Sequence, residues 1–495
     1  MLSLGYDIGS SFIKCTFLDC HTGKAVARGS YPAEEMKIAT PRQGWAEQNP
    51  DDWWSYVVRM TKNVMREKSI KGTSVGAIGI SYQMHGLVLV DDRQKVLRPS
   101  IIWCDSRAVD IGRKAFSDLG EQFCLSRLLN SPGNFTASKL RWVREEEPDT
   151  YKRIHKAMLP GDYIAMRLTG EIVTTVSGLS EGIYWDFSKN ALSKELLKLY
   201  DIDEKLLPKV CPTFSVQGTL TKNAAEELEI AAGIPVAYRA GDQPNNAFSL
   251  NVLNPGEVAA TAGTSGVVYG VLDKVTYDAA SRVNPFAHVT HTPEQIRLGI
   301  LLCINGTGIL NSWARKQFAA ELKYDQMNTL AAGAPVGSDG VVVIPFGNGA
   351  ERILENKNVG AHIAGVDFNT HTRAHILRAV QEGIAFSFRY GMDIMREMGV
   401  NLTRIRAGNA NMFLSPVFRQ VLSDCTGASI ELFDTDGAEG AARGAAIGAG
   451  IVGSFAEVFR NLNKIEEVRP VAANLDKTAS AYAKWLAELE KILKK

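Results

Sequence analysis

The sequence predicts an α/β fold with two lobes around a central cleft, and three observations support that prediction. Strands and helices alternate through the first half of the chain, as they do in α/β domains. A strand–turn–strand segment opens each half, at residues 2–19 and again at residues 258–272. Pro255-Gly256, a typical turn sequence, stands directly before the second segment. The duplication indicates two similar lobes that face one another.

The composition is that of a globular protein, and its charge favours a small-molecule partner over a nucleic acid. Apolar residues make up 45% of the 495 residues and charged residues 22%, with a formal net charge of +1. Because there is no basic stripe, a nucleic-acid partner is not expected. No apolar run reaches the ~20 residues of a membrane helix, and the first residues lack the pattern of a secretory signal. With seven scattered cysteines, the chain is expected to be cytoplasmic.

We expect the first lobe to span residues 1–248. Beyond its opening segment, strands are expected at residues 25–31, 75–81, 87–90 and 101–103. Asn49 and Pro50 are residue types favoured at the start of a helix. The apolar residues between 53 and 65 then recur at the spacing of a helix with one buried face. These features predict mixed strands with a helix packed on them.

The second lobe is expected to span residues 249–495. Residues 437–450 carry glycine or alanine at every third or fourth position, which predicts a helix that packs very closely on its neighbours. Packing against a sheet is the simpler interpretation, and a role near a ligand stays open. From residue 476 onward, the apolar spacing predicts an amphipathic terminal helix.

The two opening turns are candidate phosphate-binding loops. Residues 9–11 read Gly-Ser-Ser and residues 263–265 read Gly-Thr-Ser, so each offers backbone N–H groups and hydroxyls that suit a phosphate. A single turn of this kind is ordinary. The chain has no GxxxxGK[ST] loop and no strand-borne GxGxxG, which leaves the paired turns as the candidate cradle. Only the first turn has a carboxylate beside it, Asp7, which indicates a metal ion on that side.

Asp242 is the candidate general base. It follows an apolar segment and Gly241, so its carboxylate is expected at the end of a strand where a substrate can approach. Such a carboxylate can orient an acceptor hydroxyl and take its proton during phosphoryl transfer. The alternative is an aspartate that caps the next helix.

Two further clusters suggest a binding site for a polyhydroxyl ligand. Gln83, Met84 and His85 follow one predicted strand, and Trp103, Asp105 and Arg107 follow the next. Glutamine and histidine can both donate and accept hydrogen bonds, and a tryptophan face packs against sugar C–H groups. Considered singly, the histidine could be structural and the Asp–Arg pair could fix a turn. Together with the predicted base they indicate a sugar site.

Short motifs along nearly the whole chain resemble the FGGY carbohydrate kinases, most closely the xylulose kinases among them. They occur in the family's order at residues 7–11, 44–54, 83–86, 97–103, 159–163, 241–242, 263–266 and 440–446, with the two family signatures at 139–143 and 365–382. The resemblance implies two actin-like, ribonuclease H-like lobes. It also implies ATP-dependent phosphorylation of a ketose, D-xylulose to D-xylulose 5-phosphate, with Mg²⁺ in the cleft. A homodimer is a further family-level expectation.

The resemblance assigns roles to individual residues of this chain. Asp242 is the general base, and Asp7 serves the metal and the phosphates. The expected substrate contacts are Gln83, Met84, His85, Trp103, Asp105 and Gln243. The expected nucleotide contacts are Ser10, Ser11, Lys14, Gly263, Thr264, Gly306, Gly408 and Asn411.

The chain also departs from the family pattern in three places. Residues 407–411 stand where the family has Gly-Gly-Gly-Ala, residues 345–352 alter a Pro-Tyr-x-x-Gly-Glu-Arg stretch, and Gln243-Pro244 replaces an asparagine. The nucleotide preference and the ketose therefore stay open, with ribulose, fuculose and glycerol as alternative substrates. An actin-like or chaperone-like ATPase and a catalytically silent sugar sensor are the alternatives from other classes.

Overall fold

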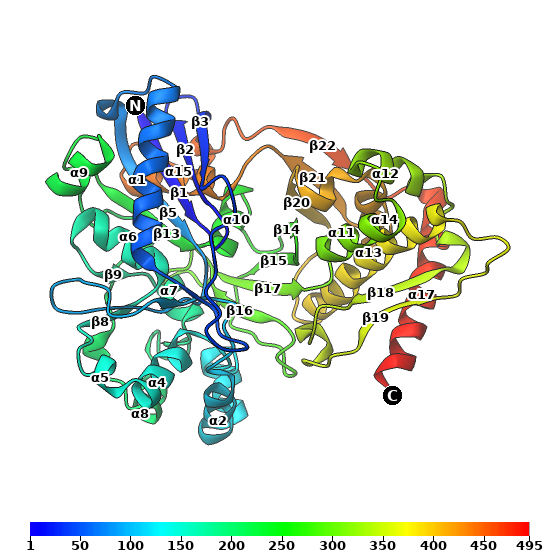
Figure 1. The fold of residues 1–495 in the computed structure, drawn as a ribbon, viewed down its shortest axis with the longest axis horizontal. Helices are drawn as coiled ribbons and strands as arrows, with labels where there is room; N and C mark the ends of the chain where they lie inside the picture. The colour runs from blue at the N-terminus through cyan, green and yellow to red at the C-terminus, as the bar shows by residue number, and fades with distance from the viewer. Residues whose placement is uncertain (495) are drawn as a thin grey trace.

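The computed structural model describes residues 1–494, which form two α/β lobes side by side (Figure 1). The N-terminal lobe is built on a five-stranded sheet in the order β13-β5-β1-β2-β3. Strands β1, β2 and β3 are antiparallel neighbours, whereas β5 and β13 run parallel to β1. The bounds are β1 (Leu2–Ile8), β2 (Ile13–Asp19), β3 (Lys24–Tyr31), β5 (Val75–Tyr82) and β13 (Val236–Gly241).

The C-terminal lobe has a seven-stranded sheet in the order β16-β17-β15-β14-β20-β21-β22. Its bounds are β14 (Val258–Ala262), β15 (Gly266–Leu272), β16 (Asn284–Ala287), β17 (Leu298–Ile304), β20 (Arg404–Gly408), β21 (Ser429–Phe433) and β22 (Lys464–Val468). Strands β14, β15 and β17 are antiparallel neighbours, and β20 and β21 continue the sheet parallel to β14. The C-terminal sheet therefore contains the five-stranded plan of the N-terminal sheet, and the predicted duplication is confirmed.

Helices α1 (Pro50–Glu67) and α6 (Pro160–Thr169) pack on one face of the N-terminal sheet. The Asn49 side chain accepts a hydrogen bond from the Asp51 N–H at 3.3 Å, which confirms the predicted start of α1. On α1, Trp53, Val57 and Val64 are buried, because their spacing places them on one side of the helix.

Smaller elements complete the N-terminal lobe. The helices are α2 (Val109–Leu119), α3 (Glu121–Phe123), α4 (Thr136–Glu146), α5 (Pro148–Tyr151), α7 (Val176–Glu181), α8 (Lys194–Tyr200), α9 (Lys222–Leu228) and α10 (Asp242–Ser249). The short strands are β4 (Glu47–Gln48), β6 (Val88–Val90), β7 (Ser100–Ile101), β8 (Lys156–Met158), β9 (Val173–Thr174), β10 (Trp185–Asp186), β11 (Ala191–Leu192) and β12 (Lys209–Val210). Several of these elements extend the lobe beyond one end of its sheet (Figure 1).

Helices and one hairpin complete the C-terminal lobe. They are α11 (Gly308–Phe318), α12 (Tyr324–Ala332), α13 (Arg373–Glu397), α14 (Pro416–Thr426), α17 (Ala472–Leu493), β18 (Val342–Phe346) and β19 (Gly360–Ala364). The short helix α16 (Phe455–Val458) packs on α15 and on Phe214 and Phe248 of the N-terminal lobe. Although α13 is 25 residues long, neither it nor any other helix within residues 1–494 is long and apolar enough to cross a membrane.

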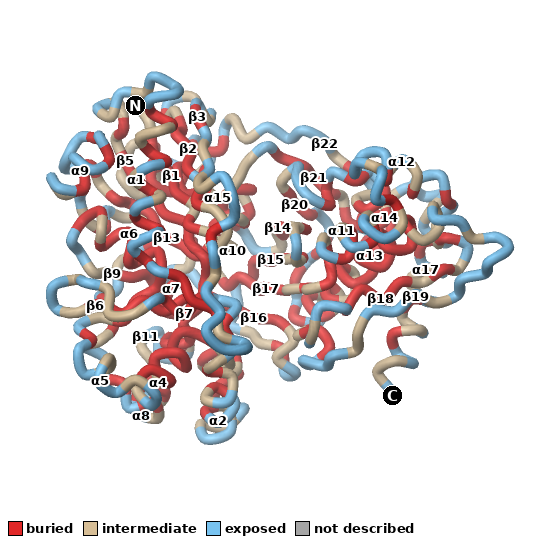
Figure 2. The backbone as a smooth tube through the Cα atoms, in the orientation of Figure 1, coloured by how far each residue is buried: buried red, intermediate tan, exposed pale blue. Residues whose placement is uncertain are grey.

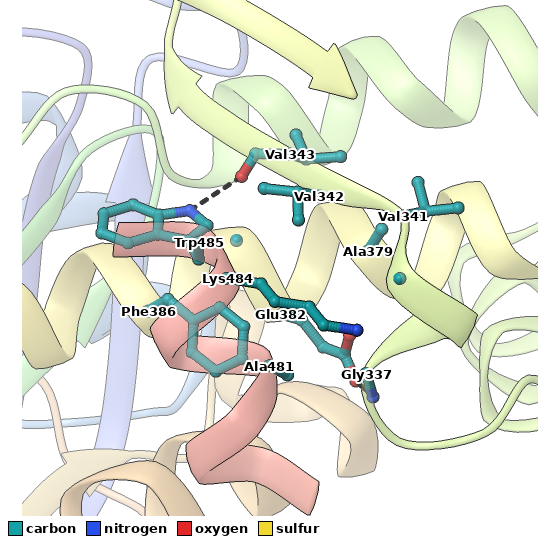
Figure 3. A pocket seen from close by; sticks show the side chains of 12 residues that line it. Gly337, Val341, Val342, Val343, Ala379, Glu382, Phe386, Ala481, Lys484 and Trp485 are labelled. Carbon is teal, nitrogen blue, oxygen red and sulfur yellow. Dashed lines mark hydrogen bonds between the residues drawn. The ribbon is translucent and has the colours of Figure 1, made fainter. Parts of the chain in front are cut away.

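The terminal helix α17 closes the C-terminal lobe, as its apolar spacing predicts. The Trp485 Nε1–H donates to the Val343 carbonyl oxygen at 2.9 Å, and the ring lies beside Phe386 (Figure 3). The gap between α17, α13 and β18 is only about 10 Å³, far below the several hundred Å³ of an ordinary ligand site. This region is therefore a packing seam rather than a binding site.

Helix α15 (Gly437–Gly448) lies on the N-terminal sheet although it comes late in the sequence. It covers the face opposite α1, and it is almost entirely buried (Figure 2). A Cβ atom on Gly5 would lie 1.9 Å from the Ala438 carbonyl oxygen, and one on Gly79 would lie 2.1 Å from that of Ala441. The predicted close packing is confirmed. A boundary at residue 249 therefore divides the sequence but does not separate the lobes in space.

Candidate active site

A cavity of about 260 Å³ lies between the two lobes. The residues that line it are Asp7, Lys14, Asp242, Gln243, Asn246, Ala260, Thr261, Ala262, Gly408, Ala410, Asn411, Phe413, Thr435, Asp436 and Gly437. Three carboxylates and one ammonium group thus border the same space. The structure brings the predicted base, the predicted metal ligand and part of the predicted nucleotide set together.

Asp242 is the first residue of α10, directly after β13. Burial and the nearby charge of Asp7 raise the pKa of its carboxyl to about 7. Burial disfavours the charged form of the carboxyl, and the negative charge of Asp7 disfavours a second negative charge beside it. A carboxyl with this pKa can hold or release a proton near neutral pH, which is the property a general base needs.

Asp7 lies on β1 opposite Lys14 on β2. The Ser81 hydroxyl donates to Asp7 Oδ1 at 2.8 Å. Burial raises the pKa of Asp7 most, while Lys14 lowers it and Asp436 raises it further. A Cβ atom on Gly437 would lie only 2.7 Å from Asp7 Oδ2, so the start of α15 lies directly against this carboxylate.

The two predicted phosphate loops are held by different contacts. The Ser10 hydroxyl accepts a hydrogen bond from Trp103 Nε1 at 3.2 Å, and the Ser11 carbonyl accepts one from the Met36 N–H at 2.8 Å. The N-terminal loop is therefore tied to the predicted sugar contacts.

The C-terminal loop is fixed to the start of α11. The Gly308 N–H donates to the Gly263 carbonyl at 2.9 Å, and the Ile309 N–H donates to that of Thr264 at 3.2 Å. A Cβ atom on Gly306 would lie 1.8 Å from the Pro345 carbonyl oxygen. The structure therefore requires glycine at 306 for packing behind the loop, whereas Gly408 and Asn411 line the cavity itself.

The predicted sugar contacts lie at the carboxyl end of β5 and in the loop that follows β7. Met84 reaches the backbone beside the predicted base, because a Cβ atom on Gly241 would lie 2.6 Å from Met84 Cγ. Trp103 is 52% exposed, so its ring is free to cover a ligand. Gln83 and Gln243 each have a buried side-chain oxygen without a hydrogen-bond partner within residues 1–494. These unpaired acceptors suit a ligand with several hydroxyls.

Comparison with known proteins identifies the family. The N-terminal domain of the FGGY family of carbohydrate kinases matches residues 2–249, and its C-terminal domain matches residues 258–452. The chain belongs to the FGGY family of carbohydrate kinases. Its fold is accordingly the two-lobed, actin-like fold of that family, and ATP is the phosphoryl donor that the family uses.

Individual relatives are similar over nearly the full length of this kinase. The xylulose kinase of Haemophilus influenzae is 28% identical, with 99% of each chain covered. The crystal structure of a xylulose kinase from Rhodospirillum rubrum is 26% identical, covers 100% of both chains and superimposes with a TM-score of 0.88. A Plasmodium falciparum glycerol kinase structure with ADP shares the fold, with a TM-score of 0.89 at 20% identity over 99% of this chain and 98% of that one.

Asp105, an expected substrate contact, is held by its own neighbours in this kinase. Its side chain is fully buried, and it accepts hydrogen bonds from Arg107 Nε, from Arg107 Nη2 at 2.7 Å and from the Ala46 N–H at 2.6 Å. A ligand would have to displace a buried ion pair to reach it, which is costly. The geometry therefore supports the alternative that the Asp105–Arg107 pair fixes a turn.

Sequence reasoning did not single out Asp436 or Glu181 in this kinase. Asp436 is the N-cap of α15, which follows β21 as α10 follows β13. The matching order of elements places Asp436 and Asp242 at equivalent points of the two lobes. The duplication, followed strand by strand, could have identified Asp436. Nothing local to the sequence identifies Glu181, whose partners are 96 and 99 residues away.

Proposed function

We propose that this carbohydrate kinase transfers the γ-phosphoryl group of ATP to D-xylulose and releases D-xylulose 5-phosphate. The observation that carries the proposal is the cavity in which Asp242, with its pKa of about 7, lies beside Asp7 and the nucleotide-side residues Gly408 and Asn411. The relatives named xylulose kinases support this choice of ketose.

In the proposed reaction, Asp242 acts on the acceptor hydroxyl. Its carboxylate orients the hydroxyl and accepts the proton as the oxygen attacks the γ-phosphorus, and the bond to the leaving ADP oxygen breaks. General-base catalysis of this kind is worth roughly 10²–10⁴ in rate. The remainder of the acceleration in such reactions comes from positioning and charge stabilisation.

Asp7 is the proposed metal ligand. Mg²⁺ prefers carboxylate oxygens and keeps several water ligands, so one or two carboxylates with phosphate oxygens are enough. Asp7 Oδ2 has no hydrogen-bond donor within residues 1–494, and Asp436 lies close enough to raise the pKa of Asp7. Two neighbouring half-buried carboxylates fit a divalent cation, which when bound would neutralise charge on the phosphates.

We assign the two turns to the phosphates of ATP. Ser10, Ser11 and Lys14 would bind them from the N-terminal lobe, and Gly263 and Thr264 from the C-terminal lobe. Thr264 and Lys14 are exposed, so both side chains are free to contact a ligand. Closure of the lobes would exclude water, which otherwise competes with the sugar as the acceptor.

For the ketose, we assign contacts to Gln83, Met84, His85, Trp103 and Gln243. Gln243 departs from the family's asparagine, so a different ketose or polyol is the second candidate substrate. The unpaired side-chain oxygen of Gln243 is the observation in its favour, because it offers an acceptor whose best hydroxyl partner depends on the sugar.

The experiment is a panel of sugars in a coupled assay of ADP release, with the phosphorylated product identified by mass spectrometry. We expect D-xylulose to give the highest kcat/KM, above ribulose, fuculose and glycerol. A higher kcat/KM for another sugar would transfer the proposal to that substrate. Sugar-independent ATP hydrolysis, or ketose binding without turnover, would refute a sugar kinase.

A further inference from the structure

His85 has a left-handed backbone conformation. It lies three residues beyond the end of β5 with φ +60°, in the left-handed region that residues other than glycine seldom adopt. Asn411, three residues beyond the end of the equivalent strand β20, has φ +54°. A strained residue persists only where its surroundings fix it, so the contacts of His85 carry information.

Two buried ionisable side chains hold both backbone polar groups of His85. The His85 N–H donates to Glu181 Oε2 at 3.0 Å, and Lys139 Nζ donates to the His85 carbonyl oxygen at 2.8 Å. Lys139 Nζ also donates to the Ile102 carbonyl at 2.9 Å, directly before Trp103. We call this arrangement the Glu181–Lys139 clamp. It joins the two loops that carry the expected sugar contacts.

Glu181, the last residue of α7, also determines which ring nitrogen of His85 carries the proton. Nδ1 lies 3.0 Å from the Glu181 carbonyl oxygen and 3.4 Å from its Oε2. Because a carbonyl can only accept, Nδ1 must be the donor. Burial first, and then the charge of Lys139, lower the pKa of His85 to about 3, so the ring is neutral. Nε2 is then a hydrogen-bond acceptor, and it has no partner within residues 1–494.

We infer that Glu181 is a positioning residue for ketose recognition, an inference that rests on the proposed function of this site. Its side chain holds the strained backbone of His85, and its carbonyl fixes the tautomer in which Nε2 accepts a hydrogen bond from a ketose hydroxyl. Glu181 also borders the predicted base, since a Cβ atom on Gly241 would lie 3.4 Å from Glu181 Oε1. The ketose contact therefore requires a hydroxyl that donates.

Substitutions at residue 181 test whether the hydrogen bond from the His85 N–H to the Glu181 side chain positions the ketose contact. Glu181→Ala removes the bond to the His85 N–H, and we expect the ketose KM to rise about tenfold or more while the KM for ATP stays within about twofold. Glu181→Gln keeps an acceptor for that N–H, so it should restore most of the affinity. The matched control is Tyr82→Phe, which removes the other hydrogen bond of the same carboxylate, 2.7 Å to Oε1, and should leave the ketose KM nearly unchanged.

A double-mutant cycle tests whether Glu181 acts through His85. In a His85→Ala background, Glu181→Ala should add no further loss of ketose affinity. Losses that multiply would show a separate role and overturn the inference, as would equal losses for Glu181→Gln and Glu181→Ala. Thermal unfolding of each variant reports whether it folds.

The tautomer can be tested in the wild-type protein without any sugar. In a protein labelled with ¹⁵N-histidine, the His85 signals, assigned from their loss in His85→Ala, should show a protonated Nδ1 and an unprotonated Nε2. The opposite tautomer, or a charged ring at pH 7, would overturn the inference. Because this measurement needs no turnover, it stands even if the sugar panel refutes the proposed function.

Discussion

Replacement of Asp242 by asparagine should remove nearly all turnover and, unusually for the loss of a half-buried carboxylate, stabilise the protein. The carboxyl has a pKa of about 7 in the folded state against an ordinary 3.8, so its ionised form is disfavoured by folding. Roughly three pKa units correspond to about 4 kcal/mol at pH 8. This is an upper limit, because the side chain borders an open cavity. Turnover should fall by roughly 10²–10⁴ with the base removed.

The raised pKa of Asp242 also determines how the stability gain of Asp242→Asn depends on pH. The folded state binds the Asp242 proton more tightly than the unfolded state, so the cost of its charge is complete above pH 7. It shrinks as the pH falls toward the unfolded pKa, and at pH 5 the gain from Asp242→Asn should be about 2 kcal/mol. Thermal unfolding without ligand at the two pH values measures this difference, and the coupled assay measures turnover.

Asp186→Asn is the matched control, because its expected effect on stability has the opposite sign. Although Asp186 is buried, hydrogen bonds from Arg127 and Ser188 lower the pKa of its carboxyl, so its replacement should destabilise the protein at pH 8. Wild-type turnover of Asp242→Asn would refute its role as the base. If Asp242→Asn gave no stability gain at pH 8, or a larger gain at pH 5 than at pH 8, the claim that the ionised Asp242 carboxylate destabilises the folded protein would be refuted.

Three further substitutions test the site and its support. Asp7→Asn should lower Mg²⁺-dependent turnover by roughly 10² or more while ketose binding by calorimetry is retained; unchanged Mg²⁺ dependence would remove Asp7 as the ligand. Gly79→Ala places a methyl 2.1 Å from the Ala441 carbonyl oxygen and should cost about 3 kcal/mol in denaturant unfolding, so an unchanged midpoint would contradict the close packing. Asp105→Ala should cost roughly 3 kcal/mol by leaving Arg107 short of a partner, with the ketose KM unchanged, whereas a raised KM would return Asp105 to the sugar site.

Much of the fold follows from local sequence signals. Each of these signals determines the structure of nearby residues only, so each can be interpreted by itself. They are the paired turns, the cap at Asn49 and the small residues of 437–450. The order of the motifs then identifies the family. The position of Asp242 at the end of a strand is also a local property, because the apolar segment before it ends at Gly241.

The remaining site residues depend on contacts that local patterns do not encode. Asp436 lies near Asp7 only because α15 crosses to the N-terminal sheet, and no periodicity in the sequence indicates that crossing. Burial favours a structural role for Asp105, since the same residue in an exposed loop would be free to bind a sugar. Glu181 lies at a helix end whose partners come from β5 and the loop after it.

The placement of α15 has a consequence for dividing this enzyme into fragments. A fragment that stops at residue 249 would present the bare face of its sheet, including Gly5 and Gly79, to solvent. The complementary fragment would carry an apolar helix with nothing to cover. The chain passes between the lobes before β14, again before α15 and again before β22, and several crossings restrict the relative motion of the lobes to a narrow hinge. Split reporters or circular permutants of this kinase should therefore be cut at surface turns within a lobe, and not at the boundary between the two family domains.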